Sequence, residues 1–212
     1  MRQGYYDLFS KVYDFVIRLH SSDREGSLRR FITGKTRLSE GDRVLDLCTG
    51  TGSVAVELAK TVGEKGLVVG LDFSQGMIEK AKQKAASQNL NHLHLVQGNA
   101  SRLPFRSASF HGVTCSHAFY ELKGTERSRA IEEVARVLKE RGIFCLMEHA
   151  KPEKFIARLL FHVRIFFLGA GDVKEFLEKE ESVLGERFKN IATEMSPTGQ
   201  SKLIHGEKEG DR

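Results

Sequence analysis

Short apolar runs alternate with helix-like spacing of apolar residues through the middle of the chain. Apolar-rich runs, which are typical of strands buried on both faces, occur at 43–48, 67–72, 110–116 and 143–148. Residues 92–97 are also expected to form a strand, with His92 and His94 alternating on its polar face. Most stretches between them place apolar residues three and four positions apart, which predicts amphipathic helices. This alternation favours a mainly parallel sheet with right-handed crossovers and helices on both faces.

Caps and glycines predict where the helices begin and end. One helix is expected over 53–62, and another over 74–87 with Ser74 as its N-cap. A third carries the apolar positions of 131–138, and Gly142 is expected just past its end.

Two further apolar-patterned segments precede the first strand. Residues 4–20 follow a helical repeat, and Leu28, Phe31 and Ile32 mark a second short helix that Gly34 should end. Two arrangements stay open for this pair of helices. They form either a flap above a binding crevice or a cover over one face of the sheet.

The pattern changes after Pro152. We expect a strongly apolar helix over residues 155–168, too short to span a bilayer, and a charged helix over 172–184. The first of these suits a sheet-covering helix, a substrate lid, a peripheral membrane contact or a homodimer face. Residues 188–195 and 202–205 flank a Pro-Thr-Gly turn, which predicts an antiparallel hairpin at the sheet edge. The expected fold is therefore Rossmann-like α/β, doubly wound, with a mainly parallel seven-stranded sheet and a C-terminal edge hairpin.

Composition narrows the classes of partner. The 212 residues carry a net charge of +5, and the basic residues are scattered without an arginine-rich arm, which disfavours nucleic acid. Three cysteines match no metal-binding motif, and their odd number disfavours a disulfide framework. Buried thiols in a reducing compartment are expected, with no metal site. With no signal-peptide pattern and no spanning apolar run, we expect a cytoplasmic protein.

The segment from Asp46 to Ser53 carries the strongest functional signal. A strand ends on an acid, the chain passes through Gly50-Thr51-Gly52, and a helix begins. Glycine is needed where the backbone adopts a positive φ or where a ligand approaches the main chain closely. The unpaired N–H groups of the helix N-terminus point to the same place. We therefore expect a ligand with a polar or anionic end here.

Other strand ends should meet this loop. Open parallel sheets bind ligands beyond the carboxyl ends of their strands, near the point where strand order reverses. That position collects Asp72-Phe73, Asn99-Ala100 and Ser116-His117. A carboxylate at the end of the second strand accepts hydrogen bonds from ribose hydroxyls, which indicates an adenosine ligand.

Two adenosine ligands are compatible with the loop. Residues 50–55 match the dinucleotide fingerprint G-x-G-x-x-A, which favours a nicotinamide-dependent oxidoreductase. However, a pyrophosphate is disfavoured beside Asp46, whereas the ammonium and sulfonium groups of S-adenosylmethionine suit an acid there. Asp46 can also cap the loop by accepting backbone N–H groups, and both roles can hold together.

Four motifs in order carry a family resemblance. VLDLCTGTG, VVGLDFSQGMIEKAK, VQGNASRLPFRSASFHGVTCSHAF and EVARVLKERGIFCLMEHAKP resemble those of class I S-adenosylmethionine-dependent methyltransferases. The likeness is greatest to the ubiquinone/menaquinone biosynthesis C-methyltransferase family, and it covers residues 4–152. It implies a single methyltransferase domain over 1–212, with a helical flap (1–40), a cofactor-binding core (41–150), and a lid with the hairpin (151–212).

The resemblance also implies which residues bind the cofactor. Residues 50–52 would contact its methionine portion, Asp46 its amino group and Asp72 its ribose, with Ser116 below the sulfonium. Residues around the adenine would be Phe73, Asn99 and Ala100. The complete implied set is Asp46, Gly50, Thr51, Gly52, Asp72, Phe73, Asn99, Ala100 and Ser116. Methyl transfer to a small-molecule acceptor, quinone-like or otherwise aromatic or lipophilic, would leave S-adenosylhomocysteine.

The acceptor side departs from the family pattern. The quinone enzymes typically have Ser-Phe-Gly-x-Arg-Asn after the fourth strand, whereas this chain has Ser-His-Ala-Phe-Tyr-Glu over 116–121. Four nearby residues have side chains suited to a general base, and none is assigned that role: His117, Glu121, Glu148 and His149. A nicotinamide-dependent oxidoreductase and a non-catalytic cofactor-binding adaptor stay as alternatives.

Overall fold

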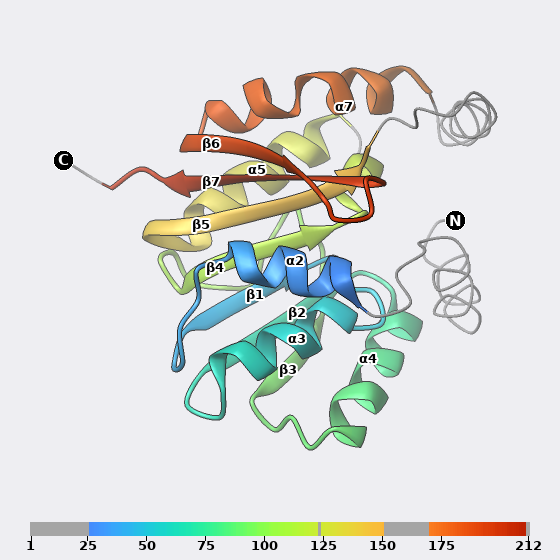
Figure 1. The fold of residues 1–212 in the computed structure, drawn as a ribbon, viewed down its shortest axis with the longest axis vertical. Coiled ribbons are helices and arrows are strands. Elements are labelled where there is room, and N and C mark those ends of the chain that lie inside the picture. The colour runs from blue at the N-terminus through green and yellow to red at the C-terminus, as the bar shows by residue number, and fades with distance from the viewer. Residues whose placement is uncertain (1–25, 123, 151–169, 211–212) are drawn as a thin grey trace.

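A seven-stranded sheet forms the centre of the computed structural model, which describes residues 26–122, 124–150 and 170–210. The strand order is β3-β2-β1-β4-β5-β7-β6, with β1 to β5 parallel and β6 and β7 antiparallel (Figure 1). The strands are β1 (Arg43–Leu47), β2 (Leu67–Asp72), β3 (Leu93–Gln97), β4 (Phe110–Ser116), β5 (Leu138–His149), β6 (Phe188–Met195) and β7 (Ser201–Lys208). The predicted doubly wound sheet with its C-terminal edge hairpin is confirmed.

Helices cover both faces of this sheet. One face packs against α2 (Ser27–Lys35), α3 (Ser53–Val62) and α4 (Gln75–Ser87), and the other against α5 (Thr125–Val137) and α7 (Ala170–Gly185) (Figure 1). A short 3-10 turn, η1 (Phe119–Glu121), follows β4. Alternation along β1 shows the two-sided burial, because Val44 packs on the α2–α3 face and Leu45 on the α5–α7 face.

Two predicted element boundaries are wrong. Helix α2 continues through Gly34 to Lys35. Helix α5 ends at Val137, because Leu138 adopts extended backbone angles (φ −68°, ψ 139°) and begins β5. Gly142 therefore lies inside a strand, within an irregular stretch of the β4–β5 pairing.

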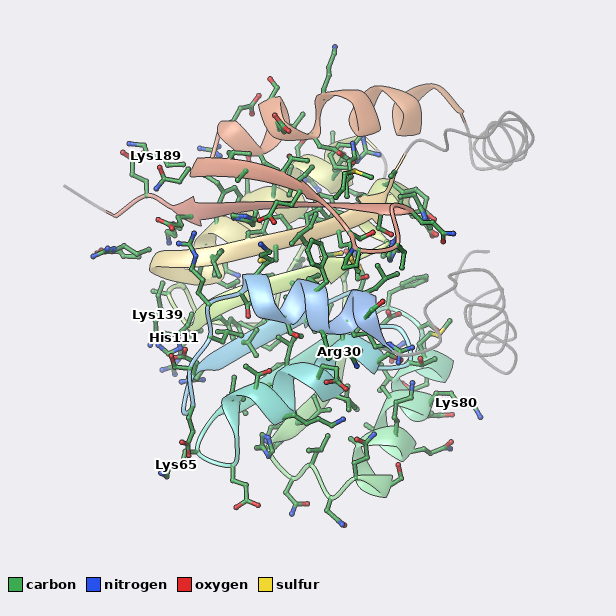
Figure 2. All side chains as sticks on the ribbon, in the orientation of Figure 1. Arg30, Lys65, Lys80, His111, Lys139 and Lys189 are labelled. Carbon is green, nitrogen blue, oxygen red and sulfur yellow. The ribbon has the colours of Figure 1, made fainter. Side chains whose placement is uncertain are left out.

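The expectation that all three cysteines are buried is confirmed only in part. Cys115 and Cys145 are buried, whereas Cys48 is partly exposed, and all three thiols are free. The expected helices at 4–20 and 155–168 lie outside the described residues. Basic side chains are spread over the ribbon, with Lys65, Lys80 and Lys189 in separate regions (Figure 2).

Candidate functional site

The loop between β1 and α3 has an unusual backbone. Cys48, Gly50 and Gly52 all have positive φ values, of 54°, 55° and 76°. A Cβ atom added to Gly52 would lie 2.9 Å from the Cβ of Ala81 on α4, closer than real Cβ contacts allow. Glycine is therefore required at position 52 for both its backbone angle and its packing.

Asp46 is the penultimate residue of β1, shortly before this loop, and is almost completely buried. Thr49 Oγ1 donates a hydrogen bond to its Oδ2 at 2.6 Å, and Thr114 Oγ1 on β4 donates to its Oδ1 at 2.7 Å. Burial raises the pKa of Asp46 to about 6, although these hydroxyls and the backbone N–H of Ala55 in α3 oppose that rise. The carboxylate is thus fixed in orientation by neutral donors and has no cation beside it among those interactions.

Asp72 ends β2 and ties together the backbone around the loop. Its Oδ2 accepts from the Gly50 backbone N–H at 2.8 Å, and its Oδ1 accepts from the Ser74 N–H at 2.9 Å. Burial raises its pKa above the usual value, and the backbone donors oppose the rise. Ser74 accepts from the Met77 N–H at 3.2 Å, so the predicted N-cap of α4 is confirmed.

The ends of β2 and β3 present polar and aromatic groups. The side chain of Phe73 is 39% exposed, which is high among the phenylalanines that the structure describes. Asn99 is exposed, and its side-chain oxygen accepts from the N–H and hydroxyl of Ser101. Ala100 is buried in the core on the α5–α7 side, so any ligand contact from it would come from its main chain.

Three aromatic side chains gather beyond the ends of β4 and β5. The rings of His117 and His149 lie 4.5 Å apart between centroids, and Tyr120 lies 5.8 Å from His149. Tyr120 also donates its hydroxyl hydrogen to Glu121 at 3.3 Å. Of the four residues suited to a general base, His117, Glu121 and His149 therefore lie around one cluster.

Glu148 is the exception among those four residues. It is completely buried on the α5–α7 face and accepts a hydrogen bond from the Tyr120 backbone N–H at 3.1 Å. Burial raises its pKa well above the usual value, and nearby Glu180 raises it further. Its contacts indicate that Glu148 supports the turn after β4 rather than facing a ligand.

Comparison with known proteins assigns the family. The model of the ubiE/COQ5 methyltransferase family matches residues 3–172. The chain belongs to the ubiE/COQ5 methyltransferase family. The resemblance seen in its motifs is confirmed, and the protein is a methyltransferase.

Relatives in this family are about a third identical to the chain over the residues that align. A demethylmenaquinone methyltransferase from Lactobacillus johnsonii is 32% identical over 88% of this chain and 85% of its own length. A demethylmenaquinone methyltransferase from Geobacillus kaustophilus is 34% identical over 78% of this chain and 67% of its own length. A ubiquinone/menaquinone biosynthesis C-methyltransferase from Geotalea daltonii is 32% identical, over 76% and 68%.

Solved structures agree on the fold at lower identity. A chain of the Haloferax volcanii complex between the Trm112 methyltransferase activator and a candidate methyltransferase gives a TM-score of 0.76, at 20% identity over 99% of this chain and 98% of that one. A SAM-dependent methyltransferase from Aquifex aeolicus gives 0.68, at 19% identity over 90% and 97%. These likenesses establish the Rossmann-like methyltransferase fold.

The fold brings the predicted site residues together at the carboxyl ends of the parallel strands. Strand order reverses between β1 and β4, and Asp46, Asp72, Asn99 and Ser116 all lie at or just beyond carboxyl ends of parallel strands. Thr114, which orients Asp46, is a site residue that the sequence analysis does not predict. Its role depends on its register opposite Asp46, which a single sequence does not reveal.

Among the residues described, no cluster of three histidine, cysteine or acidic side chains could hold a metal ion. No helix within these same ranges is long and apolar enough to cross a membrane.

Proposed function

We propose that this chain transfers a methyl group from S-adenosylmethionine to a quinone-type acceptor. The observation that carries the proposal is Asp46, a buried acid fixed by two threonine hydroxyls beside the glycine loop. A carboxylate in this position favours a ligand with an ammonium and a sulfonium group and disfavours a pyrophosphate. The family assignment supports the same conclusion over a nicotinamide-dependent oxidoreductase.

The residues of the site fit the cofactor part by part. Asp46 would hold its amino group, and the main chain at 50–52 would lie against its methionine portion. Asp72 accepts from the backbone N–H groups of Gly50, Ser74 and Phe73, and a carboxylate has about four acceptor sites, which leaves capacity for a ribose hydroxyl. Phe73 offers a partly exposed ring face to the adenine. Ser116, Asn99 and Ala100 complete the proposed set.

The cofactor supplies an activated methyl group, and the protein's own residues do the positioning. Holding donor and acceptor in line about 3 Å apart supplies much of the rate acceleration in such a displacement. Residues 41–150 hold the cofactor in this proposal. Residues 1–40 and 151–212 belong to the same single domain in this proposal.

A quinone-type acceptor is supported by the names of the relatives, which include demethylmenaquinone methyltransferases. The aromatic cluster of His117, Tyr120 and His149 suits a flat ring. We place the protein in the cytoplasm. Membrane contact or homodimerisation through 155–168 stays a prediction, because that segment lies outside the described residues.

Calorimetry and a methylation assay test the proposal. S-adenosylmethionine and S-adenosylhomocysteine should bind, and NAD should not. Labelled methyl should then move to a demethylmenaquinol with a short isoprenoid chain, kept reduced during the assay. Absence of cofactor binding would refute the proposal. Binding with no transfer to any acceptor would favour the adaptor alternative.

A further inference from the structure

We propose that Ser116, His117 and Ser201 form a proton relay that takes the acceptor's proton during methyl transfer. In this relay Ser116 faces the acceptor and His117 acts through it. The inference rests on the proposed methyltransferase function and adds how the acceptor is activated. It also defines the acceptor class, because a relay is needed only where the acceptor carries an ionisable hydrogen, as a phenol or hydroquinone does.

The ring of His117 lies between two serine hydroxyls. Its Nδ1 is 3.0 Å from Ser116 Oγ, and its Nε2 is 2.8 Å from the Oγ of Ser201, the first residue of β7. A neutral ring with its hydrogen on Nε2 satisfies both contacts, because Ser116 then donates to Nδ1 and Nε2–H donates to Ser201. In that tautomer Nδ1 is a base held against the Ser116 hydroxyl.

The backbone of His117 has an uncommon conformation, which fixes where its ring lies. His117 has φ +53°, in the left-handed region that residues other than glycine seldom occupy. Its N–H donates to the Met147 carbonyl at 2.7 Å, and its ring packs against His149. Residues kept in such conformations by several surrounding contacts concentrate at functional sites.

Strand geometry places Ser116 beside the proposed cofactor site. Thr114 hydrogen-bonds to Asp46, and Ser116 lies two residues further along β4 on the same sheet face, about 6.6 Å away at the usual strand rise. In the strand order, Asp46 on β1 stands between Asp72 on β2 and Ser116 on β4. Asp72, the proposed ribose contact, therefore lies on one side of Asp46, and the Ser116 hydroxyl lies on the other.

The proton and electron balance is complete without an additional reagent. As the acceptor atom forms its bond to the methyl carbon, the electron pair of the broken carbon–sulfur bond stays on sulfur. The proton of the acceptor's hydroxyl group passes to Ser116 Oγ, while the original Ser116 proton passes to His117 Nδ1. Where a ring carbon of a quinol is methylated, the hydrogen on that carbon then moves to the oxygen and restores the aromatic ring. The resulting imidazolium is held by its Nε2–H hydrogen bond to Ser201. After the product leaves, the Nδ1 proton returns through Ser116 to water, which restores the starting tautomer.

Several titratable groups face the His117 ring and must be separated from it experimentally. His149 contacts it from β5, Tyr120 of η1 packs against His149, and Glu121 accepts a hydrogen bond from the Tyr120 hydroxyl. Ser201 is nearly fully buried, and its own N–H donates to Ser196 Oγ at 3.2 Å in the β6–β7 hairpin. The relay therefore spans β4 and the hairpin.

The main test replaces His117 by glycine, which accepts its backbone angle without strain. With the short-chain demethylmenaquinol as acceptor and S-adenosylmethionine saturating, His117→Gly should lower kcat by about 100-fold or more. The KM for the quinol should change less than about threefold, and added imidazole should restore activity. The acidic limb of the wild-type kcat profile should also disappear. His94→Ala, on the exposed side of β3, should behave as wild type.

A second measurement decides the relay even where the acceptor is wrong. If the wild-type protein binds S-adenosylmethionine but leaves the quinol unmethylated, the proposed acceptor fails and the relay is judged from the ring itself. Nitrogen-15 NMR of labelled histidine should show the His117 hydrogen on Nε2, and Ser116→Ala should shift its Nδ1 resonance. A hydrogen on Nδ1, or kcat unchanged in His117→Gly, overturns the relay.

Discussion

Asp72 Oδ2 accepts a hydrogen bond from the backbone N–H of Gly50 at 2.8 Å, which joins the end of β2 to the loop after β1. The same carboxylate is the proposed ribose ligand. One side chain therefore shapes the glycine loop and presents oxygen atoms to the ligand. Removing it should affect both the protein and its affinity for the cofactor.

Asp72→Ala should weaken S-adenosylmethionine binding at least tenfold, about 1.4 kcal/mol. It removes the ribose acceptor and leaves the Gly50 and Ser74 N–H groups without this partner. Isothermal titration calorimetry measures the dissociation constant. Glu79→Ala on the exposed side of α4 is the matched control, and its affinity should equal that of wild type. Equal affinities for all three proteins would remove Asp72 from the proposed site.

The protonation of Asp46 should link cofactor affinity to pH. Its pKa of about 6 in the free protein means that most molecules carry a neutral Asp46 at pH 5. A bound ammonium group favours the ionised form, so binding should release a proton and weaken about tenfold between pH 7 and pH 5. Calorimetry in two buffers of different ionisation enthalpy at pH 5.5 measures that proton.

Asp46→Asn separates this linkage from other effects of acid. Asparagine keeps the shape and one oxygen, so it can accept from one of the two threonine hydroxyls and donate to the other, but it does not titrate. Its affinity should be weaker than wild type at pH 7 and should no longer release a proton on binding. The same pH dependence in Asp46→Asn and wild type would assign the linkage to another group.

Gly52→Ala should destabilise the fold. The new Cβ would lie 2.9 Å from that of Ala81, and φ at this position is +76°. We expect the free energy of unfolding to fall by roughly 1–3 kcal/mol, measured by denaturant titration. Gly34→Ala is the control, because that exposed glycine has no atom within 4 Å and lies in α2. It should be stabilising by about 0.5–1 kcal/mol.

Sequence patterns located the strand ends because each combines an apolar run with a polar residue where the run stops. Asp72 follows this rule as the last residue of β2, and Asp46 comes one residue before the end of β1; both lie at the predicted carboxyl ends of the strands. By contrast, Thr114 and Ser201 contribute through long-range hydrogen bonds. Thr114 bonds to Asp46, which is 68 positions away in the sequence, and Ser201 bonds to His117, which is 84 positions away. Such contacts depend on strand register, which the local pattern of one sequence does not encode.

The boundary between α5 and β5 shows a second limit of sequence patterns. Leu138 continues the helical spacing of Ile131 and Val134, so periodicity alone assigns it to the helix. In the structure it is buried as the first residue of β5 and pairs with Phe110. Tertiary packing overrides the local period there.

Glu148→Gln should stabilise the protein at alkaline pH. The pKa of Glu148 is raised in the folded state, mainly by burial, so folding favours its protonated form. Its contribution to stability is therefore complete below the unfolded pKa near 4.5 and is lost as pH rises through the folded pKa. Glutamine keeps an oxygen for the Tyr120 N–H and has no charge to bury.

Thermal unfolding at pH 5 and pH 8 tests this expectation. The midpoint of Glu148→Gln should exceed that of wild type at pH 8, and the gap should narrow at pH 5. Glu148→Ala should unfold at a lower temperature than Glu148→Gln at both values, because the Tyr120 N–H then loses its acceptor inside the protein. If Glu148→Gln is instead less stable than wild type at pH 8, Glu148 is ionised in the fold. In that case Arg127 and Lys202, which both interact with neighbouring Glu180, would be the cations that compensate it.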